Sequence, residues 1–128
     1  MKLREGFPDD PIKQNQLLLL SVYHLNGCLD LVADDDRIQV AALNLQAAEL
    51  AIQKSAMFPA CEYLEVGGEQ LALQPRGPWE TAYSLTLNLM TQLARAQYFC
   101  HKKAACRATC QKIVANARRF CEALPAHG

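Results

Sequence analysis

The chain has 128 residues, 51% of them hydrophobic, and its 13 basic and 13 acidic residues give a formal net charge of zero. This length fits one helical domain over 1–128, and the apolar content excludes a disordered chain and supports a core without metals or disulfides. No run of about 18 apolar residues occurs, and the mixed charges before residue 12 do not form a secretory leader, so we expect no membrane partner and a cytoplasmic location.

The first predicted helix covers 12–33, after an irregular N-terminus over 1–11 that contains two prolines. Apolar residues of one face recur at steps of three and four: Leu18, Val22, Leu25, Leu29 and Val32. A second stripe lies beside this face: Leu17, Leu20, His24, Cys28 and Leu31. Because the apolar sector is wider than one stripe, we expect a central helix whose Leu17, Leu20 and His24 contact another protein.

The second predicted helix covers 37–57. The three aspartates before it, Asp34–Asp36, are suited to capping its first turn, because carboxylates accept hydrogen bonds from the free amides there. Its alanines permit close packing against another helix, and Pro59 is expected to end it.

A β-hairpin is predicted over 61–74, between the second and third helices. The Gly67-Gly68 pair permits the positive φ angles of a tight two-residue turn between strands 61–66 and 69–74. In that register four apolar side chains share one face: Leu64, Val66, Leu71 and Leu73. A lone hairpin is marginal in water, so we expect this face to dock on helices or on another chain.

Two helices are predicted in the C-terminal half, over 79–100 and 104–124. The alternative is one helix of about 45 residues, because neither glycine nor proline interrupts 79–124. The polar segment 101–103 breaks the apolar stripe and favours two helices. The predicted fold is therefore mainly α, an antiparallel four-helix arrangement with one inserted β-hairpin.

The charges are segregated along the chain. From residue 91 onward there are seven basic residues and one acid, so this segment carries +6 and the preceding residues carry −6. We favour a basic last helix that packs beside acidic helices, with Arg107 and Arg118 contributing to a protein contact. A nucleic-acid accessory function is the alternative, but no aromatic side chains interleave the basic ones.

Six cysteines in a chain without an export signal are expected to be thiols that behave as small buried hydrophobic residues. The densest cluster of metal-ligating types comprises Cys100, His101, Cys106 and Cys110. Three thiols and an imidazole suit tetrahedral zinc, although the spacing differs from that of zinc knuckles. We expect no resident metal or cofactor, and we keep a metal- or redox-responsive site here as an alternative.

Arg95 precedes His101 by six positions, in the segment Arg-Ala-Gln-Tyr-Phe-Cys-His. This spacing resembles the motif of the all-helical ribonucleases of the HEPN class. The resemblance implies acid–base chemistry by His101 and stabilisation of phosphate charge by Arg95. The polar residue that usually follows the arginine is replaced by Ala96. No other catalytic constellation is present, and we do not predict an enzyme.

The favoured hypothesis is a helical interaction protein of bacterial or phage type that regulates or inhibits another protein. An anti-activator, an immunity or antitoxin-like partner and a phage-type inhibitor all fit this description. Surplus apolar surface also predicts a homodimer.

Overall fold

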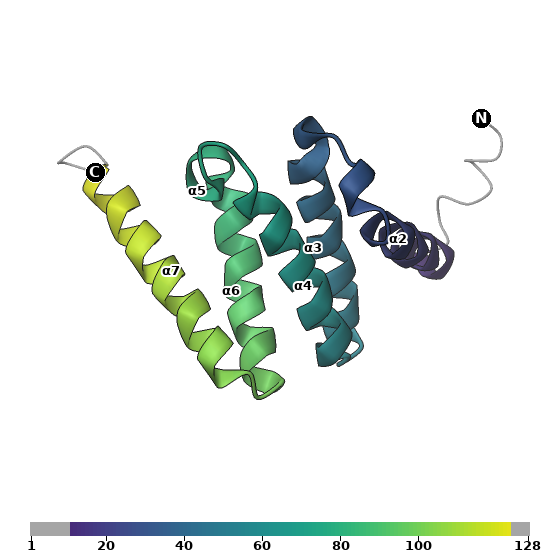
Figure 1. The fold of residues 1–128 in the computed structure, drawn as a ribbon. Helices are drawn as coiled ribbons and strands as arrows, with labels where there is room; N and C mark the ends of the chain where they lie inside the picture. The colour runs from purple at the N-terminus through teal and green to yellow at the C-terminus, as the bar shows by residue number, and fades with distance from the viewer. Residues whose placement is uncertain (1–10, 124–128) are drawn as a thin grey trace.

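The computed structural model describes residues 11–123, with side chains as far as residue 117, and shows helices joined by short turns (Figure 1). Its elements are α2 (Pro11–Asn26), η1 (Leu29–Leu31), η2 (Asp34–Asp36), α3 (Arg37–Gln53), α4 (Met57–Ala72), α5 (Pro78–Thr81), α6 (Tyr83–Phe99) and α7 (Lys103–Ala123). The long helices pack in chain order: α2 on α3, α3 on α4, α4 on α6, and α6 on α7. From α3 to α7 they form an antiparallel row, which α2 crosses at one end (Figure 1).

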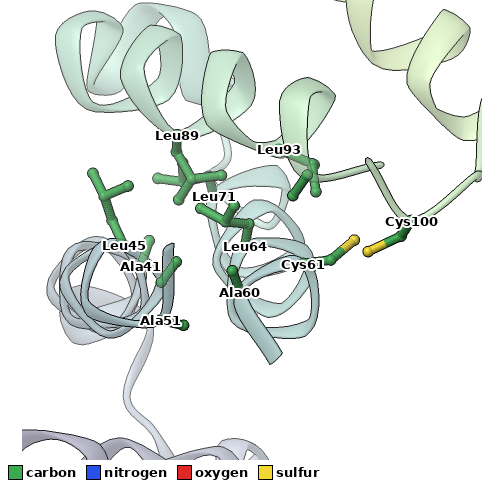
Figure 2. Packing of buried hydrophobic residues seen from close by; sticks show 12 residues of the cluster. Ala41, Leu45, Ala51, Ala60, Cys61, Leu64, Leu71, Leu89, Leu93 and Cys100 are labelled. Carbon is green, nitrogen blue, oxygen red and sulfur yellow. The ribbon is translucent and has the colours of Figure 1, made fainter. Parts of the chain in front are cut away.

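The core lies between α3, α4 and α6 (Figure 2). Leu64 and Leu71 of α4 and Leu89 of α6 are its largest fully buried apolar side chains. Alanines of α3 and α4, including Ala41 and Ala60, are also fully buried and let the helix backbones approach closely. Burying each leucine contributes roughly 1.5–3 kcal/mol, so these three side chains are the main apolar contribution at the centre of the row.

The β-hairpin predicted over 61–74 is wrong. Helix α4 runs from Met57 to Ala72, and no strand occurs within residues 11–123. Its buried residues recur at helical spacing: Ala60, Cys61, Leu64, Gly67, Gln70 and Leu71. The predicted arrangement of four helices is therefore wrong too, because α4 adds a long helix to the row.

Gly67 lies inside α4 because another helix packs directly on it. A Cβ at this position would stand 2.7 Å from Leu89 Cδ1 and 3.4 Å from the Ala41 carbonyl oxygen. Pro59 lies in the first turn of α4, where its missing N–H is not required, and so it does not end the preceding helix. Helix α3 ends at Gln53, and Ser55 makes the turn with a φ of 61°.

The mainly α class and the separation of the last two helices are confirmed. Helix α6 ends at Phe99 and α7 begins at Lys103, with His101 between them at a φ of 64°. The first helix is shorter than predicted, because α2 ends at Asn26 and two 3-10 turns follow it. The predicted irregular segment, apart from Pro11, lies outside the described residues.

Polar contacts fix α2 on α3. The Asn26 and Asn44 amides pair reciprocally, with nitrogen-to-oxygen distances of 2.8 and 3.1 Å, and Asn44 is fully buried. Arg37 donates to the Val32 carbonyl oxygen and to the Gln70 side chain, and so connects the turn after α2 with both α3 and α4. A buried amide is stable only when its hydrogen-bond partners are correctly placed. The Asn26–Asn44 pair therefore helps to fix the position in which α2 crosses the row.

Candidate interaction surface

The outward face of α2 is apolar and exposed. Its four large side chains are Ile12 (70% exposed), Leu17 (58%), Leu20 (54%) and Tyr23 (70%). At about 100° per residue Leu17 and Leu20 point away from Val22, which is fully buried against the row, and Ile12 and Tyr23 lie on the flank between the two sides. We call these four residues the outward face of α2.

Few charges accompany this face. Between Ile12 and His24 the only acidic residue, lysine or arginine in the sequence is Lys13. Clustered apolar side chains on a protein surface mark contact sites, and the centres of such sites are depleted of charge. The outward face of α2 has both properties.

A hollow of about 680 Å³ lies between the end of α2 and the first half of α4. Its lining residues are Tyr23, His24, Asn26, Gly27, Cys28, Pro59, Glu62, Tyr63 and Val66. Tyr23 packs edge-on against His24, with ring centroids 5.5 Å apart. Because Tyr23 belongs both to the hollow and to the outward face of α2, the two features are continuous.

A second hollow, of about 430 Å³, lies between α4, α6 and α7. Glu65 and Glu69 of α4 line it together with Met90, Leu93 and Lys112. At its edge the Lys102 ammonium lies 3.1 Å from Glu65 Oε2, and the hydrogen bond to this carboxylate raises the pKa of Lys102.

The structure separates the residues that the hairpin prediction grouped as one docking face. Leu64 and Leu71 are buried inside the row, so they stabilise the fold and are not available to a partner. Val66 is half-buried in the α2–α4 hollow, and Leu73 is 58% exposed after the end of α4.

The other predicted contact residues are exposed where they are described. Leu17 and Leu20 lie on the outward face of α2, and His24 lies at its edge, in the hollow. Arg107 is exposed on α7, and the Arg118 side chain lies outside the described part of the chain. The row therefore places Leu17, Leu20 and His24 together at one end and Arg107 on the helix at the other end.

The four candidate zinc ligands do not gather at one point, although Cys106 and Cys110 lie within hydrogen-bonding reach of each other. Cys100 is buried and its sulfur points toward Cys61 (Figure 2), whereas His101 is exposed in the turn before α7. Cys106 donates to the Ala94 carbonyl oxygen at 3.3 Å, and Cys110 is exposed. Among the described side chains, which extend over residues 11–117, no three from His, Cys, Asp or Glu are placed to hold a metal ion.

Arg95 and His101, the pair on which the ribonuclease resemblance depends, are both exposed. Arg95 lies on α6 and His101 lies in the following turn. Neither side chain makes a hydrogen bond with any residue in the described part of the chain. The ribonuclease alternative stays a prediction.

Cys61 is a buried thiol on α4. Burial raises its pKa to about 12, with the Glu65 carboxylate adding to the effect. We expect Cys61 to resist alkylation by iodoacetamide in the folded protein, while the exposed Cys110 is modified first, as peptide mass mapping over time would show. Because the raised pKa holds the thiol neutral, its contribution to stability is complete below the unfolded pKa of about 8.5 and is lost as the pH rises toward 12.

Rapid alkylation of Cys61 at neutral pH, at a rate like that of Cys110, would contradict this burial. The burial would also be contradicted by a second result. This result is a free energy of unfolding that falls no more steeply above pH 9 in the wild type than in a Cys61→Ala variant.

Sequence reasoning missed Tyr23, Glu62 and Tyr63 as surface candidates. The hairpin register placed Glu62 and Tyr63 on a strand, where they were not associated with the end of the first helix. The spacing of Cys61, Leu64 and Leu71 at three and seven is also a helical pattern, and it was the signal that would have identified α4.

Comparison of the chain with protein-family models, curated proteins and solved structures gives no match. Over the described part of the chain, none of the helices combines the length and apolar character that crossing a membrane requires.

Proposed function

We propose that this protein acts by binding another protein through the outward face of α2. The observation that carries the proposal is the exposure of the four outward-face side chains on a helix that packs on the row through Val22, which is fully buried, and through Leu18 and Leu25, which are half-buried. The complementary surface is an apolar helix face of the partner, because a helix packs most readily against ridges of similar spacing.

Regulation or inhibition of the partner is the activity that such binding would serve. A cytoplasmic location agrees with the free, buried thiols of Cys61 and Cys100, since a reducing compartment keeps thiols in this state. A second copy of the chain is the second candidate partner. The low charge of the outward face favours it, because Lys13 is the only lysine, arginine or acidic residue between Ile12 and His24 and so little like-charge repulsion opposes the contact of two such faces.

The test compares the wild type with a Leu17→Gln/Leu20→Gln double variant. The matched control is Leu73→Gln, a substitution of an equally exposed leucine away from α2. Native mass spectrometry of protein purified from its source cells reports the mass of any complex or dimer. We expect a complex with the wild type and the control, and its loss in the double variant with an unchanged melting temperature.

A wild type that remains a free monomer would contradict the proposal. Retention of the same complex by the double variant would contradict the assignment of the contact to α2.

A further inference from the structure

We propose that the hollow between α2 and α4 receives an arginine side chain of the partner protein. The inference rests on the proposed function and specifies one chemical feature of the partner. Tyr23 joins the hollow to the outward face of α2, so a segment seated on that face reaches the hollow without a break.

The charges of α4 favour a cationic occupant. From Met57 to Ala72 the helix contains Glu62, Glu65 and Glu69 and neither lysine nor arginine. Glu65, which lines the other hollow, is already paired with the Lys102 ammonium. Glu62, which lines the hollow, is exposed and has no hydrogen bond or ion pair within the described chain.

The composition of the hollow favours arginine over lysine. Two tyrosine rings, Tyr23 and Tyr63, line the same space as the Glu62 carboxylate. A guanidinium group stacks on an aromatic face and donates two parallel N–H bonds to a carboxylate, whereas an ammonium is a compact, strongly hydrated charge. Among the described residues no lysine or arginine lines the hollow, and His24 is the one basic side chain there.

The size of the hollow admits more than the arginine. A volume of about 680 Å³ lies within the range of ordinary ligand sites. Pro59 and Val66 supply apolar wall next to the polar groups, and this wall suits an apolar residue beside the arginine. The expected recognition element is therefore an arginine flanked by an aliphatic side chain.

The experiment titrates the full ¹⁵N-labelled chain with the peptide acetyl-Leu-Arg-Leu-amide and follows amide chemical shifts. The comparison peptide carries citrulline in place of arginine, which keeps the shape and removes the charge. We expect the shifts to concentrate at Tyr23, Glu62 and Tyr63, with at least tenfold weaker binding of the citrulline peptide.

The Glu62→Gln variant is expected to weaken binding of the arginine peptide at least tenfold. The matched control is Glu69→Gln, which removes a second exposed carboxylate of α4 that lines the other hollow, and it is expected to change affinity less than twofold. Equal binding of both peptides, an unchanged affinity in Glu62→Gln, or shifts centred on the α4–α6–α7 hollow would each overturn the proposal.

The two proposals fail separately. If the complex depends on Leu17 and Leu20 but the arginine peptide does not bind at Glu62, only the arginine site is wrong. If the peptide binds at Glu62 but no complex forms through α2, the outward-face proposal is wrong while the cation site stands.

Discussion

Leu64→Ala is expected to lower the free energy of unfolding by about 2–5 kcal/mol, the range for buried leucines truncated to alanine. Leu64 is fully buried, and it lies in the core cluster with Leu71 of its own helix and Leu89 of α6 (Figure 2). Truncation removes apolar contacts and leaves a cavity that rigid neighbours fill only in part. Urea unfolding followed by circular dichroism measures the loss.

Leu73→Ala is the control for this variant. Leu73 is 58% exposed and caps the C-terminus of the same helix, so its truncation is expected to change stability by about 0.5 kcal/mol or less. A hairpin docked by one apolar face would bury both leucines. Equal destabilisation by the two substitutions would therefore contradict the helix and the burial that we describe.

Gly67→Ala is expected to destabilise the protein by about 1–3 kcal/mol, the usual range for overpacking a tight core. The added Cβ would stand 2.7 Å from Leu89 Cδ1 and 3.4 Å from the Ala41 carbonyl oxygen. Leu89 is itself fully buried, so it cannot move away without disturbing other contacts. The expected loss outweighs the gain of about 1 kcal/mol in helix propensity from glycine to alanine.

Gly68→Ala is expected to stabilise the protein by up to about 1 kcal/mol, because the propensity gain is not opposed by a clash. The nearest atom to its added Cβ is Leu89 Cδ2 at 3.9 Å, an ordinary contact. Thermal or urea unfolding of the two variants measures the difference. Stabilisation by both substitutions would contradict the close helix crossing at Gly67. Destabilisation by both would instead indicate a turn that requires glycine at both positions.

Helical periodicity was sufficient to predict where most helices lie. The stripe through Leu18, Val22 and Leu25 is half-buried or buried against the row, as its spacing predicts. The neighbouring stripe through Leu17 and Leu20 has the same apolar character, yet it is exposed. Periodicity does not decide between two such stripes, because the position of α3 and the Asn26–Asn44 pair determine which of them is covered.

The α4 region shows the limit of local reasoning. Gly67-Gly68 satisfies the requirements of a tight turn, and the alternation of Leu64 and Val66 suits a strand. The close crossing at Gly67 depends on Leu89 and Ala41, which lie on other helices and more than twenty residues away in sequence. Tertiary packing therefore overrides the local turn signal, and the hollow beside Tyr63 becomes visible only when α4 is a helix.

The most direct test of the proposed function is site-specific photo-crosslinking in the source cells. A photoreactive phenylalanine derivative replaces Leu20 on the outward face of α2 or, as the control, Val114, which is 55% exposed on α7 at the other end of the row. We predict one crosslinked species of defined mass from position 20, identifiable by mass spectrometry, and none from position 114. No crosslinked species from position 20, or the same species from both positions, would contradict binding through α2.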